Sequence, residues 1–112
     1  MKTENVGLTV RVAFVAYRDI KDAIRFDIFE FTDDIDSIKS AIQKQSATGG
    51  GDFPEDVQGG FNKALGLDWG ADSTKLAFHI ADAPGHGKDI NGCGGFGHGD
   101  SYPNGSPEGY KL

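Results

Sequence analysis

The stretch GGGDFPED at residues 49–56 decides how the rest of the sequence is interpreted. Its three glycines make a flexible turn, and Pro54 suits the first turn of a helix that begins there. The turn therefore brings the carboxylates of Asp52, Glu55 and Asp56 to the start of that helix. Hard divalent cations prefer such oxygen ligands, and a cation would offset the repulsion between the acids. The alternative is that Asp52 caps the helix while Glu55 and Asp56 complement its dipole.

A further acid, Asp82, follows the apolar stretch 74–81, whose pattern predicts a strand. In open α/β sheets, ligands bind beyond the carboxyl ends of the strands. The loop acids and this strand-end acid together predict a metal site at that edge. Hard oxygen ligands favour Mg²⁺, with Mn²⁺ or Ca²⁺ as alternatives.

The composition is typical of one small domain, since 112 residues are too few for two. There are 17 acidic residues against 11 basic ones, which argues against nucleic acid because its phosphates require a basic face. The surplus of acid fits cation binding, although it also serves simply to keep a protein soluble. No stretch is long and apolar enough to span a membrane, and the polar N-terminus lacks a signal-peptide core.

The compartment is left open by the sequence. The single cysteine, Cys93, excludes an intrachain disulfide framework. A lone cysteine is typical of a reducing compartment such as the cytoplasm.

The apolar pattern predicts three strands. Residues 9–17 are apolar on both faces, so this strand is expected inside a sheet covered on both sides. Residues 24–31 alternate and then reverse phase at Phe29, which predicts an antiparallel hairpin with a bulge. Residues 74–81 form the third strand, in which His79 is interpreted as a packed core histidine.

Two helices are predicted, one from the N-caps at residues 32–34 to about Gln45 and one over residues 54–65. The second helix contains Gly59 and Gly60, each of which costs about 1 kcal/mol of helix propensity. A close approach of this helix to a neighbouring strand is the expected reason for the pair.

Residues 85–112 hold nine of the 17 glycines and are predicted to form a long loop. This loop contains His86, Cys93, His98 and Asp100, whose spacing does not match the close pairs of a zinc site. They are therefore interpreted as scattered loop residues. The sequence has no phosphate-binding loop, nucleophile elbow or acid/base pair, so no catalysis is predicted.

Three motifs together resemble a von Willebrand factor A-like domain. They are VRVAFVAYRD at 10–19, SATGGGDFPEDVQGGFNKALGLDW at 46–69 and IADAPGHG at 80–87. In order and spacing they are similar to the A-like domains of hemicentin-like proteins and to those beside atypical alpha-kinases. A further likeness is to the A-like domain of integrin β subunits. The resemblance covers about residues 8–90.

The resemblance implies a metal-ion-dependent adhesion site, usually loaded with Mg²⁺. Glu55 and Asp82 match acidic residues of its second and third metal loops. By the integrin-like comparison, Asp19, Asp52 and the carbonyl of Pro54 match ligands of an adjacent second cation. Gly50 stands where that pattern has an asparagine.

The resemblance also implies an incomplete Rossmann-like α/β fold, because the first strand, the first helix and the C-terminal elements of the family have no counterpart. The expected organisation is a polar stub at 1–8, a partial A-like domain at 9–84 and a Gly/Pro-rich loop at 85–112. Metal binding is expected to be weak, because the family's Asp-x-Ser-x-Ser motif is absent.

The function implied by the resemblance is metal-ion-dependent protein binding. The ion presents an open coordination position to an acidic side chain of a partner protein and does no chemistry. The alternatives are an accessory domain of an alpha-kinase-type enzyme and a non-functional remnant.

Overall fold

The strands β1 (Val12–Tyr17) and β2 (Phe26–Thr32) pair antiparallel and form a two-stranded sheet, as the hairpin pattern predicted. Val12 pairs with Thr32 whereas Phe14 pairs with Phe29, so the register shifts by one residue between them. This shift confirms the irregularity that the phase reversal predicted. The computed structural model describes residues 7–91 and 99–111.

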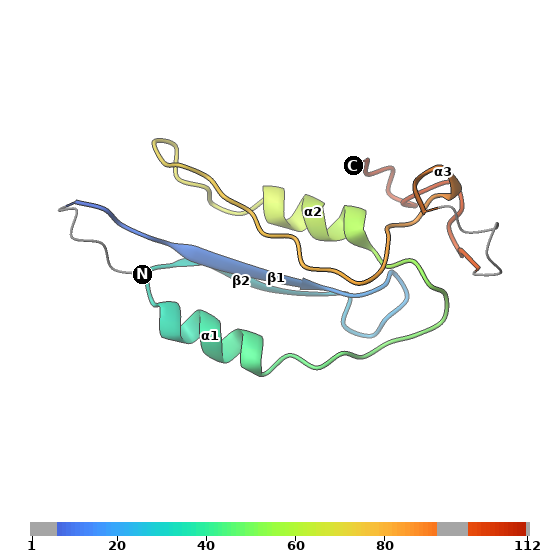
Figure 1. The fold of residues 1–112 in the computed structure, drawn as a ribbon, viewed down its shortest axis with the longest axis horizontal. Helices are drawn as coiled ribbons and strands as arrows, with labels where there is room; N and C mark the ends of the chain where they lie inside the picture. The colour runs from blue at the N-terminus through green and yellow to red at the C-terminus, as the bar shows by residue number, and fades with distance from the viewer. Residues whose placement is uncertain (1–6, 92–98, 112) are drawn as a thin grey trace.

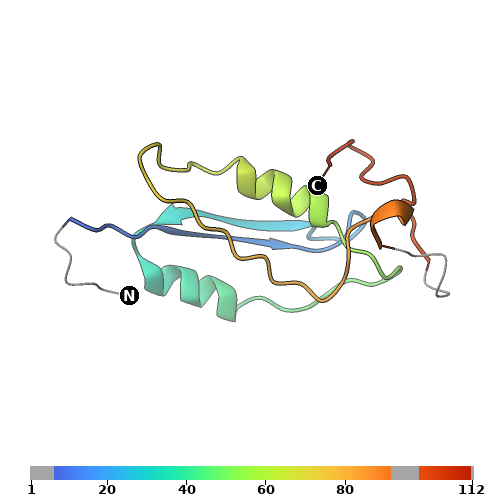
Figure 2. The ribbon, with the colours of Figure 1, turned by 45° about the horizontal axis from the view of Figure 1, so that its top comes forward.

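Two helices lie on opposite faces of this sheet (Figures 1 and 2). The first, α1 (Ile35–Gln43), packs on β1 and β2, and the second, α2 (Val57–Leu65), packs on β1. Asp34 caps α1 by accepting a hydrogen bond of 3.2 Å from the Ser37 N–H. The expectation that the first strand is covered on both faces is confirmed. Its expected place inside the sheet is not, because β2 is the only strand that pairs with β1 among the described residues. A small mixed α/β structure is therefore the class that the structure establishes.

The helix α2 begins at Val57, three residues later than predicted, because Asp56 is its N-cap rather than Asp52. The Asp56 Oδ1 atom accepts a 3.0 Å hydrogen bond from the Gly59 N–H. Its Oδ2 atom lies 2.7 Å from Nε of Arg25. The interpretation of Asp52 as the cap is therefore wrong, and the carboxylate of Asp52 is left for other contacts.

The close approach predicted for the glycine pair is confirmed. A Cβ atom built on Gly60 would lie 2.7 Å from Cδ1 of Tyr17 on β1. A Cβ atom on Gly59 would lie 2.7 Å from Cζ of Phe26 on β2. Neither position has room for a larger side chain unless a neighbour moves.

Residues 74–81 do not form the predicted third strand. In both views they run as an extended segment alongside β1, coloured yellow to orange (Figures 1 and 2). Leu76, Phe78 and Ile80 are 72%, 88% and 90% exposed. An apolar alternating stretch becomes a strand only when a neighbouring backbone pairs with it, and no described backbone pairs with this segment although β1 runs close to it.

The interpretation of His79 as a core residue is also wrong, since this residue is exposed. Its Nε2 atom nevertheless lies 2.8 Å from the Tyr17 hydroxyl. Its ring meets that of Phe61 edge-on, with centroids 4.9 Å apart. These two contacts hold the extended segment against β1 and α2.

The glycine-rich C-terminal part is mostly loop, as predicted, with one short helix, α3 (Lys88–Asn91). The loop folds back on the rest of the molecule. The N–H of Ser101 donates to Oδ2 of Asp52 at 2.7 Å, and Glu108 pairs with Arg25 at 2.6 Å. None of the helices that the structure describes is long and apolar enough to cross a bilayer.

Candidate metal centre

Three loops meet at one end of the sheet: the loop after β1, the loop before α2 and the loop after residue 83. Backbone hydrogen bonds hold them together. The Asp56 N–H donates to the Arg18 carbonyl at 3.1 Å, and the Glu55 N–H donates to the Pro84 carbonyl at 2.9 Å. The second of these contacts belongs to an isolated parallel bridge between Glu55 and Gly85. The loop positions of this end are therefore set by main-chain contacts.

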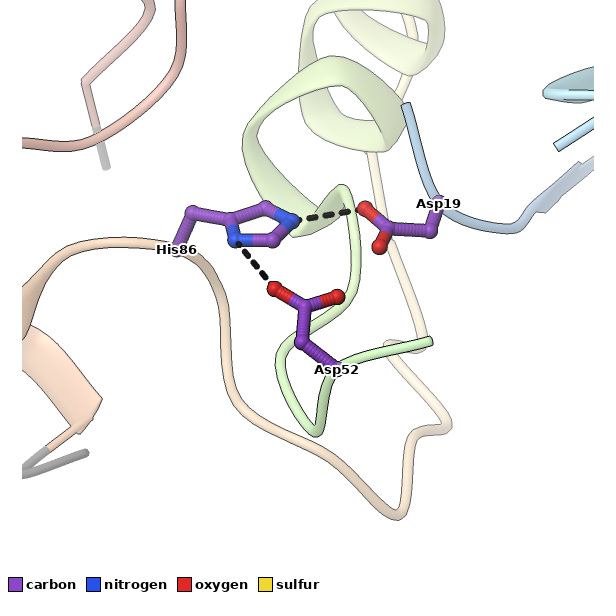
Figure 3. Close-up of side chains that lie close together, drawn as sticks. All are labelled: Asp19, Asp52 and His86. Atoms are coloured by element: carbon purple, nitrogen blue, oxygen red, sulfur yellow. Dashed lines mark hydrogen bonds and ion pairs between the residues drawn. The ribbon is translucent and has the colours of Figure 1, made fainter. Parts of the chain in front are cut away.

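This arrangement brings Asp19, Asp52 and His86 together (Figure 3). Each residue offers one ligand atom, and these atoms all lie within 4.8 Å of one another. The Nε2 atom of His86 is 2.6 Å from Oδ1 of Asp19, and its Nδ1 atom is 3.7 Å from Oδ2 of Asp52. His86 is 0% exposed. A buried group of two carboxylates and one imidazole could hold a metal ion.

A fourth residue, Asp100, supports the group from the C-terminal loop. Its Oδ1 atom lies 2.7 Å from Nδ1 of His86 and accepts a 2.8 Å hydrogen bond from the Tyr102 N–H. Its Oδ2 atom accepts a hydrogen bond of the same length from the Gly87 N–H. The ring of Tyr102 also meets the His86 ring edge-on, with centroids 5.0 Å apart. The C-terminal loop therefore fixes the orientation of the imidazole.

The charges of the cluster act on one another. Burial lowers the pKa of His86, but its hydrogen bonds to Asp19 and Asp100 outweigh burial and leave that pKa above its ordinary value. Burial raises the pKa of Asp19. The pKa of Asp52 is lowered, because the effect of burial is outweighed by hydrogen bonding, first of all from the Ser101 N–H. The carboxylates around His86 thus make an environment that stabilises positive charge.

Of the four acidic residues proposed from the sequence as metal ligands, two lie in the cluster and two lie outside the three-residue group. Asp19 and Asp52 lie in the cluster with His86. Glu55 is half-buried beside it, and burial together with the charges of nearby aspartates raises the pKa of Glu55. Asp82 is exposed on the segment that leads to His86 and is not a member of the three-residue group.

Sequence reasoning did not select His86 and Asp100. Both were interpreted as scattered loop residues, and that interpretation is wrong for these two because their side chains meet. The other two residues considered with them, Cys93 and His98, lie outside the described residues. His86 carries one local signal, its place in the Gly-His-Gly triplet that follows the apolar stretch. No local signal connects it with Asp100.

The fold and the cluster define a small mixed α/β protein with a candidate metal centre. This chain is 34% identical, over 113 residues, to the alpha-protein kinase vwkA of Dictyostelium discoideum. The similarity covers 100% of this chain but 17% of the kinase, so the chain spans about a sixth of that relative's length. No protein-family model matches the chain. No solved structure matches it either.

Proposed function

We propose that this chain is a non-catalytic accessory domain of an alpha-kinase-type protein and binds a protein partner through a divalent cation. The observation that carries the proposal is the convergence of Asp19, Asp52 and His86 where three loops meet. The similarity to vwkA supports the kinase context. Under this proposal the phosphoryl-transfer chemistry belongs to another part of the longer protein.

The cluster supplies the features that such binding requires. Asp19 and Asp52 offer carboxylate oxygens, and His86 offers a ring nitrogen, so the three leave coordination positions of a cation to other ligands. An acidic side chain of a partner fills one of these positions. By the resemblance to A-like domains the ion is Mg²⁺, Mn²⁺ or Ca²⁺, and the partner is a protein.

The same resemblance carries the finer proposal for the fold, a Rossmann-like arrangement of the von Willebrand factor A type. Two features support it. Helices cover both faces of the sheet, and the cluster lies just beyond the carboxyl end of β1. Both features are those of a ligand-binding edge in such folds.

The binding proposal is tested with the ¹⁵N-labelled chain and a short aspartate-containing peptide, titrated in Mg²⁺, Ca²⁺, Zn²⁺ or a chelator. The peptide is expected to shift the amide resonances around Asp19, Asp52 and His86 when a divalent cation is present and not in the chelator. Asp52→Asn should weaken peptide binding, because it removes one ligand charge. Asp72→Asn is the matched control, since it removes the same charge from an exposed loop. Peptide binding that persists in the chelator would contradict the proposal.

The non-catalytic role has its own test. The purified chain is incubated with Mg²⁺ and radiolabelled ATP, with a general kinase substrate present. We expect no transfer of label to the substrate or to the chain itself. Transfer that depends on the purified chain and survives removal of contaminating kinases would show that the domain is an enzyme.

A further inference from the structure

The side chain that distinguishes this cluster is a histidine. Mg²⁺ and Ca²⁺ take oxygen ligands, whereas an imidazole nitrogen suits Zn²⁺ and other first-row transition ions. His86 is 0% exposed and lies between carboxylates instead of at the rim of the cluster. Its Nε2 atom points toward Asp19 (Figure 3). Any cation held by all three residues of the group therefore has a nitrogen in its coordination shell.

Asp100 prepares this nitrogen for a metal. When Nδ1–H of His86 donates to Oδ1 of Asp100, at 2.7 Å, the lone pair of the neutral ring is on Nε2. Histidines that bind metals almost always make such a contact between the second ring nitrogen and a carboxylate or carbonyl oxygen. The carboxylate of Asp100 is itself held by the N–H groups of Gly87 and Tyr102. The contact is therefore part of a fixed arrangement.

The charge of the cluster also favours a bound cation. The carboxylates of Asp19, Asp52 and Asp100 surround one imidazole, and their side chains are 11%, 10% and 3% exposed. Buried carboxylates repel one another unless positive charge lies between them. A protonated ring brings one positive charge to three negative ones, whereas a divalent ion brings two.

We propose that the cluster binds a transition-metal ion of the Zn²⁺ class through Nε2 of His86 and a carboxylate oxygen of Asp19. The carboxylate of Asp52, whose Oδ2 atom lies 3.7 Å from Nδ1, turns toward the Nε2 side of the ring to supply the third ligand. In this arrangement Asp100 is a positioning residue that fixes the ring through Nδ1. The inference rests on one part of the proposed function, the existence of a cation site. It does not depend on the proposed protein partner. The competing explanation is a hydrogen-bonded network that joins three loops without any metal.

The test uses the whole 112-residue chain with Cys93→Ser and His98→Asn in every sample, because these two side chains could bind Zn²⁺ elsewhere. Calorimetry gives the affinities for Zn²⁺ and Mg²⁺. ¹⁵N NMR follows the ring nitrogens of His86, whose resonances are assigned by connecting the ring to the backbone amide of the same residue. Zn²⁺ should move the Nε2 resonance of His86 and leave Nδ1 protonated. Mg²⁺ should move neither.

Two variants separate a positioning role from a general structural one. Asp100→Asn should weaken Zn²⁺ binding by about 10–100-fold, the usual effect of losing the partner of a metal-bound histidine. Asp89→Asn removes an exposed carboxylate from α3 and should leave the affinity unchanged. Far-UV circular dichroism checks that both variants fold. If Asp100→Asn does not fold, the effect of Zn²⁺ on the Nε2 resonance of His86 in the protein with only Cys93→Ser and His98→Asn still tests whether the ion binds this nitrogen.

The outcomes distinguish this inference from the proposed function. Saturating Zn²⁺ that leaves the Nε2 resonance in place would overturn the inference. If Mg²⁺ then supports binding of the aspartate-containing peptide, the proposed function holds with an oxygen-ligated ion. If Zn²⁺ shifts Nε2 and the peptide does not bind with any cation, the metal assignment holds and the proposed partner binding fails.

Discussion

At the residue scale, Gly60 shows how a costly residue supports the packing of this molecule. Its lack of a side chain lets α2 lie directly against the ring of Tyr17. Tyr17 in turn reaches His79 through its hydroxyl group. Gly60 therefore allows α2 to pack on Tyr17 of β1, and Tyr17 in turn contacts His79 of the extended segment.

Gly60→Ala is expected to reduce the free energy of unfolding by up to about 2 kcal/mol. The overlap of the new Cβ atom with the Tyr17 ring costs about 1–3 kcal/mol, and the gain in helix propensity returns about 1 kcal/mol. Urea unfolding followed by circular dichroism measures the difference. The control is Gly66→Ala, whose Cβ atom meets only ordinary contacts at 3.6 Å and whose φ is −80°. A parent-like stability in both variants would show that the helix can move away from Tyr17.

Glu108 is a second residue whose contribution to the free energy of unfolding can be measured, through its ion pair with Arg25. Its Oε1 atom lies 2.6 Å from Nη1 of Arg25, and this contact lowers the pKa of Glu108 from 4.5 to about 2. A carboxyl group whose pKa is lower in the folded state stabilises it above the unfolded-state pKa. That stabilisation is lost as the pH falls from about 4.5 through about 2.

Glu108→Gln is therefore expected to lower the free energy of unfolding by at most about 1 kcal/mol at neutral pH, since the pair is partly exposed. The difference from the parent should shrink as the pH falls through this range. Urea unfolding at several pH values measures it, with Asp72→Asn as an exposed control. A difference that stays constant down to the lowest pH would rule out the ion pair as its source.

At the scale of elements, residues 74–81 have the composition of a strand without the pairing of one. Their apolar side chains Leu76, Phe78 and Ile80 lie in solvent, while β1 and β2 pair along their length. The side-chain contacts of His79 keep the segment close to β1 without any ladder of backbone hydrogen bonds. The segment is thus held by side chains alone in the part of the chain that the structure describes.

Amide hydrogen exchange should distinguish the unpaired extended segment from the paired strands β1 and β2. We expect amides of residues 75–80 to exchange close to the rate of an unprotected peptide, and the paired amides of β1 and β2 to exchange much more slowly. NMR-detected exchange measures both in one sample. Equal protection of residues 75–80 and β1 would mean that the segment pairs with another backbone in solution.

At the scale of the whole molecule, the described chain is elongated and has a small core. Its radius of gyration is 16.4 Å, compared with about 13 Å for a compact domain of this length. The buried hydrophobic residues that the structure describes are Ile38, Ala41 and Val57. Large apolar side chains of α2 and residues 74–81 remain exposed. Little apolar burial is available to offset the entropy of ordering the chain.

The purified chain is therefore expected to self-associate or to melt without strong cooperativity. Size-exclusion chromatography with light scattering, over a range of concentrations, measures the first effect and calorimetry the second. Replacing both Phe78 and Ile80 by serine should reduce self-association, because these two are the most exposed of the large apolar side chains that the structure describes. A monomer with a sharp cooperative melt would contradict this expectation.

The sequence by itself determined the elements whose signals are local. The alternation of residues 24–31, the reversal at Phe29 and the glycine pair in α2 each predicted a feature that the structure contains. Such signals are read over a few residues because strand and helix periodicities are short. The resemblance of three motifs also drew attention to Asp19 and Asp52.

Only the tertiary structure decided the features that depend on distant residues. It showed residues 74–81 without a pairing partner, which no local pattern can reveal because pairing belongs to two segments. It brought His86 to Asp19, 67 residues away in the sequence, and to Asp100, 14 residues away. A metal centre depends on such convergence in space, and the spacing of residues along the chain does not report it.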